Sequence, residues 1–388
     1  MPAHINPSAS PRTNPAINHP PTTDHPLLIA GAGLAGCVLA RQFEARRQPF
    51  LLVGDPARAS AADVAAGIIN PVTGRWMTKS WRIDAFAPEA RDFYRSLERD
   101  SGRSLYHPIG ITRFCLNPDD VKRAGRRLRN PRYASVLGSF QAPGNAGADC
   151  ADPHGSLRIS GGAWVDLPAV LAVLRTRYRN LGGLLVGDFN HRALQRVEGG
   201  WRYAGRIFRG VIFCEGAALP ANPWFGHLPL QPAKGETLLC HSNQFKLPDK
   251  ILHHDKWVLP DADGHFRLGA TYDDADPTPE PTGPARRQLL DAFKKLFPDR
   301  PEPTVLKHLA GHRPGTADAR PLLGAHPTES GLYLLNGLGS KGASLAPTLS
   351  RELCEFLLDG KALDPEADLR RFDRPAPYPA KGSVSGPQ

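Results

Sequence analysis

The hydrophobic pattern that starts at residue 27 predicts a strand, a glycine turn, a helix and a second strand. Residues 27–30 form a continuous apolar run, as in a strand of a parallel sheet that is buried on both faces. Apolar residues then recur at helical spacing over 34–46, and a second apolar run covers 50–53. We therefore expect a βαβ unit at the start of the folded chain.

Later segments repeat this pattern with β-rich stretches between them. Residues 331–360 again predict a strand, a glycine-rich loop and a helix. Further helices are expected over 83–102, 164–183 and 283–297, and strands over 110–116, 209–217 and 230–275. Because parallel-type α/β segments occur at the start, middle and end of the chain, we expect two interleaved domains.

The composition is that of a globular protein, with 41% hydrophobic and 22% charged residues among 388. No apolar run approaches the roughly 18 residues of a membrane-spanning helix, so we expect no membrane partner. Residues 1–25 lack the apolar core and the twin arginine of an export signal. We expect a disordered lead there and a disordered tail over 373–388.

Six scattered cysteines give no metal or redox motif. None belongs to a C-x-x-C pair, which disfavours a zinc site and a dithiol centre. His253 and His254 are adjacent, and adjacent side chains of a strand point to opposite faces, so we expect no metal there either. The unpaired cysteines favour a reducing compartment, and we expect a cytoplasmic protein.

Much of the net charge of +10 lies in the basic stripe, which we define as residues 122–132. On a helix, Lys122, Arg126 and Arg129 would share one face. Such a stripe either binds nucleic acid or is a solvated helix face. We favour the solvated face, because no aromatic residue interleaves with the charges and no zinc-finger or RNA-binding motif is present.

The turn after the first strand carries Gly31, Gly33 and Gly36 in a G-x-G-x-x-G pattern. The first glycine allows the tight turn, the second lets the backbone approach a pyrophosphate, and the third lets helix and strand pack closely. The N-terminus of the helix then faces the phosphate charge. An acid normally follows the second strand to bind a ribose. Its usual position is Gly54, so either Asp55 or the backbone makes that contact.

Four stretches resemble the D-amino-acid oxidase/glycine oxidase (DAO) family of FAD-dependent oxidoreductases. They are IAGAGLAGCVLA near the start, ASAADVAAGIINP at 59–71, VIFCEGA at 211–217, and GHRPGTADARPLLG with GLYLLNGLGSKGASLAP within 311–347. Their order and spacing match the family over residues 27–358. Within the family the chain is similar to the glycine-oxidase-like branch and to the oxidase half of tRNA-modifying MnmC proteins.

The resemblance implies an α/β + β fold. A Rossmann-like FAD-binding domain is interleaved with a substrate domain that is built on a large antiparallel sheet. The FAD-binding domain is expected to comprise residues 26–85, 155–225 and 305–372. The substrate domain is expected to comprise residues 86–154 and 226–304.

The resemblance also implies where FAD binds. Leu34 and Ala35 would face the pyrophosphate. The residues beside the flavin would be Ala66, Gly67 and Ile68. The loop around the pyrimidine edge of the ring would comprise Leu338, Gly339, Ser340, Lys341, Gly342, Ala343 and Ser344. Because Ser340 and Lys341 stand where some relatives carry a flavin-linking cysteine, the resemblance implies non-covalent FAD.

The chemistry of this loop agrees with that placement. Gly337, Gly339 and Gly342 would let backbone N–H groups approach a flat ring. The following helix would direct its positive end at the loop, which stabilises the negative charge of a reduced flavin. Pro347 is compatible with this helix only near its first turn.

In the family, the arginine of the RP motif holds the substrate carboxylate over the flavin, and by that match Arg313 has this role. A guanidinium binds a carboxylate through two parallel hydrogen bonds, which fixes the substrate Cα–H toward flavin N5. Pro314 restricts the backbone of Arg313. The alternatives are a structural Arg313 that binds Asp318, and a clamp formed by Arg320.

Other candidates are weaker. Tyr272, at the end of a predicted strand, is either a catalytic-site residue or a sheet-surface tyrosine. Tyr106 and His107 are possible pocket residues. Lys234 and Gly235 are interpreted as structural.

We expect FAD-dependent oxidation of the C–N bond of a small amino acid or secondary amine, of the glycine, sarcosine or D-amino-acid type. Hydride would pass from Cα to flavin N5, and oxygen or another acceptor would reoxidise the flavin. One alternative is the MnmC-like removal of a carboxymethyl group from a modified tRNA uridine, which the basic stripe supports and the missing methyltransferase half weakens. A second alternative is a flavin-bearing subunit without turnover.

Overall fold

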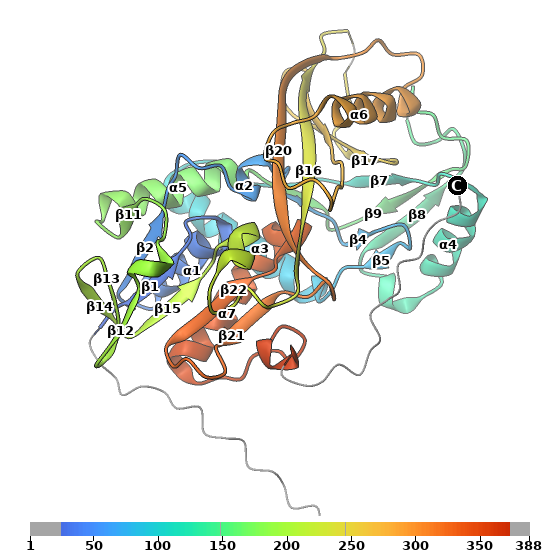
Figure 1. Ribbon diagram of the computed structural model, residues 1–388. Helices are drawn as coiled ribbons and strands as arrows, with labels where there is room; N and C mark the ends of the chain where they lie inside the picture. Colours follow the sequence, from blue (N-terminus) through green and yellow to red (C-terminus); the bar gives the residue numbers. More distant parts are fainter. Residues whose placement is uncertain (1–24, 148, 245, 373–388) are drawn as a thin grey trace, which may run out of the picture.

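The computed structural model describes residues 25–147, 149–244 and 246–372, and two large sheets dominate it (Figure 1). The expected disordered segments, 1–25 and 373–388, lie outside the described residues except for His25. No helix in the described ranges is long and apolar enough to cross a membrane.

The first sheet has six strands, of which only β21 is antiparallel to its neighbour. In spatial order they are β11 (Leu184–Val186), β2 (Phe50–Gly54), β1 (Leu27–Ala30), β15 (Gly210–Phe213), β22 (Leu332–Asn336) and β21 (Leu322–Ala325). Its central strands are buried on both faces, as their continuous apolar runs predict.

Helices cover one face of this sheet, and a small sheet covers the other (Figure 1). The helices are α1 (Leu34–Ala45), α5 (Leu167–Asn180), α7 (Gly342–Asp359) and α3 (Ile83–Ser101), which packs on α7. The small sheet comprises β12 (Gln195–Val197), β13 (Gly200–Tyr203) and β14 (Arg206–Phe208). The βαβ unit at the start of the chain and the strand–loop–helix unit at its end are confirmed.

Helix α5 has a side-chain cap at its start and a glycine at its end. The carboxylate of Asp166 accepts a hydrogen bond from the backbone N–H of Ala169 at 3.0 Å, which caps α5. Gly182, just beyond this helix, takes a φ of 68°, the left-handed conformation that ends helices.

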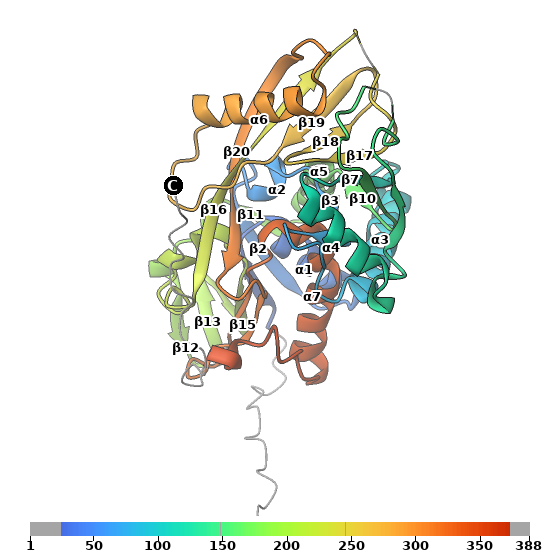
Figure 2. The same ribbon diagram turned by 90° about the vertical axis from the view of Figure 1, so that its right-hand side faces the viewer.

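The second sheet has eight strands and supplies one wall of the cavity described below. In spatial order they are β20 (Thr304–Thr316), β16 (Leu230–His241), β19 (His265–Gly269), β18 (Trp257–Pro260), β17 (Ile251–His253), β7 (Ile111–Phe114), β9 (Ser156–Ile159) and β8 (Leu137–Gln141). All neighbours are antiparallel except β17 and β7. Helix α6 (Gly283–Leu296) lies across one face (Figure 2), and the other face is turned toward α2 (Ala61–Val64) and the six-stranded sheet.

The strand expected to end near Tyr272 is shorter in the structure. β19 ends at Gly269, and Tyr272 therefore lies in the loop that follows it. Beyond Gly269 the chain stays beside β16 only through isolated backbone hydrogen bonds, of Thr271 with Glu236 and of Asp273 with Lys234. Tyr272 is thus a loop residue and not the last residue of a strand.

Short elements complete the fold. They are β3 (Ile68–Ile69), β10 (Ala163–Val165), β6 (Tyr106–Pro108), β4 (Val72–Thr73), β5 (Thr78–Lys79) and α4 (Pro118–Leu128). Strands β16 and β20 are the longest of the eight-stranded sheet and extend from it toward the six-stranded sheet (Figure 1). The arrangement confirms the α/β + β fold, while the domain boundaries given above stay a prediction.

Candidate active site

A cavity of about 1010 Å³ is lined by residues of both large sheets and of the loops between them. It brings together most of the expected cofactor residues, namely Gly31, Gly33, Leu34, Ala35, Asp55, Ala66, Gly67, Ile68, Leu338, Gly339, Ser340, Gly342 and Ala343. Both candidate substrate residues, Arg313 and Tyr272, line it as well. Four expected cofactor residues do not line it: Gly36, Gly337, Lys341 and Ser344.

The glycine turn has the geometry that its motif predicts. Gly31 takes a φ of 113°, and a Cβ there would lie 2.3 Å from the carbonyl oxygen of Cys214. A Cβ on Gly36 would lie 1.9 Å from the carbonyl oxygen of Gly31, so this glycine allows the helix to pack on the turn. Gly33 caps α1 without a side-chain hydrogen bond, which leaves N–H groups of the first turn available for a phosphate.

Gly54 cannot carry the expected acid for a steric reason. A Cβ at this position would lie 2.5 Å from the Cβ of Ala32 in the glycine turn. Asp55, the next residue, lines the cavity, and its carboxylate accepts a hydrogen bond from the N–H of Ala57 at 2.9 Å. A contact between Asp55 and a ribose stays a prediction.

Arg175 is a cavity residue that no sequence motif indicates, since it lies in the middle of α5. It is buried, and its Nε–H donates to the carbonyl oxygen of Ala32 at 2.9 Å. Its ion pair with Asp63 is long, at 3.4 Å. The guanidinium therefore adds positive charge beside the glycine turn, where an anionic dinucleotide would lie.

Tyr94 explains how a proline fits within α7. Pro347 has no N–H to donate to the carbonyl oxygen of Ala343, four residues earlier. The buried Tyr94 hydroxyl donates to that oxygen instead, at 2.9 Å. Ser344 also supports the loop, because its hydroxyl donates to the carbonyl oxygen of Lys341 at 3.0 Å. Burial lowers the pKa of Lys341.

Among the described residues, the hydrogen bonds of the Arg313 guanidinium go to backbone oxygens. Its two terminal nitrogens donate to the carbonyl oxygens of Lys234, at 3.2 Å, and Thr271, at 3.0 Å. Burial lowers the pKa of Arg313, and within the described ranges no carboxylate pairs with it. The alternative partner, Asp318, binds Arg371 at 2.8 Å. A half-buried cation in the cavity wall that pairs with no described carboxylate is suited to an anionic ligand.

The other candidates lie in different surroundings. Tyr272 is 68% exposed, and its ring centroid lies 5.6 Å from the guanidinium carbon of Arg313. Arg320 pairs with Glu366 at 3.0 Å and does not line the cavity. The remaining two line a separate, smaller cavity of about 450 Å³: Tyr106 and His107.

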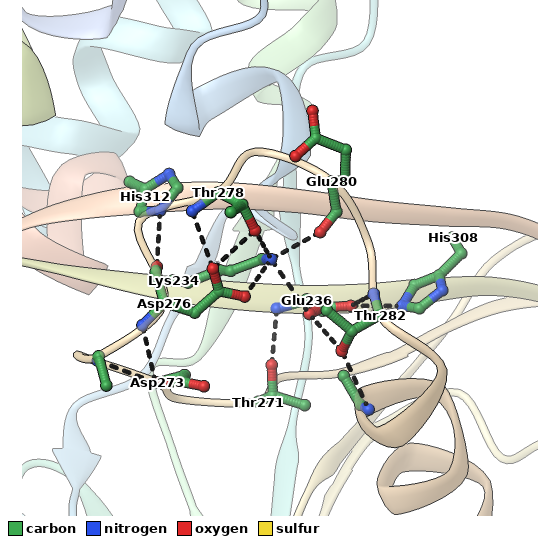
Figure 3. A network of polar contacts seen from close by, with 12 residues as sticks. Lys234, Glu236, Thr271, Asp273, Asp276, Thr278, Glu280, Thr282, His308 and His312 are labelled. Atoms are coloured by element: carbon green, nitrogen blue, oxygen red, sulfur yellow. Dashed lines mark hydrogen bonds and ion pairs between the residues drawn. The ribbon is translucent and has the colours of Figure 1, made fainter.

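Lys234 connects Arg313 to the loop over 271–282, which we name the site loop (Figure 3). Its side chain is 1% exposed, and its ammonium donates to Asp276 at 2.6 Å, to Thr278 at 3.0 Å and to the carbonyl oxygen of Glu280 at 2.6 Å. Its own carbonyl oxygen accepts from Arg313. The structural interpretation of Lys234 therefore fits the observed contacts.

The cavity residues fit FAD at one end and a carboxylate at the other. The N-terminus of α1, which has no side-chain cap, the glycine turn and Arg175 suit the pyrophosphate of an anionic dinucleotide. Arg313 and Tyr272 line the same cavity from the eight-stranded sheet and the site loop. In the described part of the chain, no group of three or more histidine, cysteine, aspartate or glutamate residues could hold a metal ion.

Comparisons with known proteins agree with this geometry. A bifunctional tRNA 5-methylaminomethyl-2-thiouridine biosynthesis protein MnmC of Marinobacter nauticus is 27% identical, over 88% of this chain and 57% of that protein. The chain thus spans little more than half of that relative. The crystal structure of a glycine oxidase from Geobacillus kaustophilus covers 87% of this chain and 95% of its own, with a TM-score of 0.75 and 20% identity.

Two further matches establish the family. A glycine oxidase of Pseudomonas putida is 33% identical over 388 aligned residues, which cover 92% of this chain and 99% of that protein. The family described as FAD dependent oxidoreductase (DAO) matches residues 27–356. The resemblance drawn from the four sequence stretches is thereby confirmed: the chain belongs to the DAO family of FAD-dependent oxidoreductases, and FAD is its cofactor.

Proposed function

We propose that this protein oxidises the C–N bond of an amine or amino acid whose carboxylate is held by Arg313. The observation that carries the proposal is the half-buried guanidinium in the cavity wall, whose hydrogen-bond partners among the described residues are the carbonyl oxygens of Lys234 and Thr271. Relatives named glycine oxidase support a substrate of the glycine, sarcosine or D-amino-acid type.

Bound FAD supplies the acceptor for a hydride from the substrate Cα. The residues of this chain bind and orient the substrate. The carbonyl oxygens of Lys234 and Thr271 fix the guanidinium plane of Arg313, so the carboxylate is held in one orientation. The residues that contact this guanidinium carry no carboxylate that would accept a proton, so we expect the amine to bind in its neutral form.

The test is anaerobic reduction of the bound flavin by glycine, sarcosine, proline and D-alanine. Arg313→Met removes up to two charge-assisted hydrogen bonds and should raise the half-saturating substrate concentration roughly 100-fold or more. Arg320→Met, whose arginine pairs with Glu366 outside the cavity, is the matched control and should leave it unchanged. Equal effects of the two substitutions would contradict the proposal.

A second candidate function is favoured by one structural observation in the basic stripe. Trp76 is 55% exposed, and the guanidinium carbons of Arg75 and Arg123 lie 4.8 Å and 4.9 Å from its ring centroid. Arg127 donates to the Trp76 carbonyl oxygen at 3.1 Å. The basic stripe contains no aromatic residue of its own, but Trp76, which is distant in the sequence, lies beside it in the structure. Such a surface suits an unpaired nucleic-acid base.

In this candidate the carboxylate on Arg313 belongs to a carboxymethyl group on a modified tRNA uridine, as the similarity to an MnmC protein suggests. Transfer RNA should then bind with a strong salt dependence. Trp76→Ala should weaken the binding of transfer RNA and leave the oxidation of free amines unchanged.

A flavin that neither amines nor transfer RNA reduce would favour the subunit without turnover. The six free cysteines support the cytoplasmic placement that we also propose.

A further inference from the structure

One row of residues crosses the cavity face of the eight-stranded sheet. Thr237 of β16 pairs with Gly269 of β19, Gly269 with Trp257 of β18, and Trp257 with His253 of β17. All four line the cavity. A Cβ on Gly269 would lie 2.6 Å from the Trp257 ring, so the glycine gives the indole room to lie along the sheet. This row therefore forms a continuous part of the cavity wall, from β16, which pairs with the strand that carries Arg313, to His253 of β17.

At and beside the far end of this row, two buried side-chain nitrogens have no hydrogen-bond partner among the described residues. His253 pairs in register with Arg113 of β7, which is 9% exposed. One Arg113 nitrogen, Nη2, donates to the carbonyl oxygen of Gly74 at 2.8 Å, whereas Nη1 has no partner among the described residues. The same is true of His253 Nδ1. Because buried polar atoms in proteins are normally hydrogen-bonded, this pair points to a ligand group.

The guanidinium of Arg113 suits this end to an anion, although the carboxylate of Asp255 also lines the cavity here. Burial lowers the pKa of Arg113, yet no carboxylate forms an ion pair with it in the described ranges. Burial, and then the charge of Arg113, lower the pKa of His253 to about 3. His253 therefore presents a neutral imidazole with one N–H donor beside a guanidinium.

Arg313 and the pair of Arg113 and His253 lie too far apart for one small amino acid to contact both. Arg313 extends over Gly235 of β16, and β19 and β18 separate that strand from β17. At ~4.8 Å between neighbouring strands, the backbones at the two ends lie ~14 Å apart. The carboxylate and amine of glycine are joined by a single carbon, so glycine on Arg313 would leave this end of the cavity unused.

We propose that His253, with Arg113 beside it, binds a second, anionic oxygen group at the far end of an extended, carboxylate-bearing amine substrate. A carboxylate and a phosphate share this chemistry. The apolar middle of the substrate would pass along Trp257 and Gly269. The inference rests on the proposed function, because Arg313 fixes the near end, and it makes His253 a specificity-determining residue for that reaction.

The test measures binding to the holoenzyme without turnover. Linear α,ω-dicarboxylates and ω-phosphonocarboxylates of increasing length are compared with monocarboxylates of equal length, through the change in flavin absorbance. At one length, the second group should lower the dissociation constant roughly 10-fold or more, as a hydrogen bond to a charged group does. The better of the two series identifies the carboxylate or the phosphate.

Substitutions test which residue causes the tighter binding of ligands that carry a second anionic group. His253→Leu should abolish it, and His253→Gln, which keeps an N–H donor, should retain part of it. His254→Leu is the matched control, because the His254 ring lies 5.9 Å from that of Phe114, on the opposite face of the sheet. His254→Leu should keep the gain in full.

The outcomes separate the two proposals. If monocarboxylates and their two-headed counterparts bind equally well at every length, the second contact is absent and only water satisfies His253. If His253→Leu keeps the gain, another residue makes the contact. Both results overturn this inference and leave Arg313 in place. If Arg313→Met fails to weaken even the monocarboxylates, the proposed function itself fails.

Discussion

The guanidinium of Arg313 occupies the space where a side chain at Gly235 would begin. A Cβ on Gly235 would lie 2.0 Å from the nearest guanidinium nitrogen and 2.2 Å from the guanidinium carbon. Gly235 has no positive φ, so a backbone conformation does not require glycine there. Glycine at this position leaves room for the guanidinium, and Gly235 therefore helps to position Arg313.

We predict that Gly235→Ala displaces Arg313 and weakens carboxylate binding. The added methyl group breaks the contacts of the guanidinium with Lys234 and Thr271, so KM should rise roughly 10-fold or more while flavin stays bound. Gly110→Ala is the matched control, since a Cβ there meets nothing within 4 Å. Steady-state kinetics on both variants test this, and a KM for Gly235→Ala within error of the control would refute it.

A second prediction concerns the site loop. Asp276→Asn removes the ion pair between the site loop and Lys234. We therefore expect a higher KM and faster cleavage of residues 271–282 in limited proteolysis. The neighbouring Asp274→Asn, which removes an exposed carboxylate with no ion pair among the described residues, should change neither. Fast cleavage in both variants, or in neither, would mean that Lys234 does not anchor the loop.

The pH dependence of this anchor follows from the sign of the shift. The hydrogen bond from Lys234, then those from Thr278, hold the pKa of Asp276 well below its ordinary value. A carboxyl group with a depressed pKa stabilises the fold above its ordinary pKa, and the contribution disappears as the pH falls through the depressed value. We therefore expect the wild-type site loop to resist proteolysis equally at every pH from neutral down to about 5.

The sequence predicts features that depend on neighbouring residues and misses those that depend on strand register. The turn at Gly31 is recognisable because motif and contacts lie within a few positions. The row from Thr237 to His253 is not, because it requires the pairing of four strands, one of them only three residues long. The meeting of Trp76 with the basic stripe is missed for the same reason, since distant segments form that contact.

A third prediction tests how Tyr94 supports α7. Tyr94→Phe leaves the carbonyl oxygen of Ala343 buried without a donor, which should lower the free energy of unfolding by about 1–3 kcal/mol. Pro347→Ala restores a backbone N–H at the next helical turn, so the cost of Tyr94→Phe should be smaller in that background. Urea unfolding of the wild type, both single variants and the double variant measures this coupling. Additive costs would show that the hydroxyl does not replace the missing N–H.

The last prediction follows from the neutral His253. Burial and the Arg113 charge lower its pKa from 6.5 to about 3, so between these values the unfolded chain binds a proton that the folded chain does not. Stability then falls as the pH falls through this window, by up to about 1.4 kcal/mol per pH unit for one such group. His253→Leu removes this term, so its stability relative to the wild type should improve steadily from pH 7 to about pH 4. Denaturant unfolding across that range measures the difference. Parallel curves for the two proteins would show that folding does not lower the pKa of His253, which would contradict a neutral imidazole beside Arg113 in the folded protein.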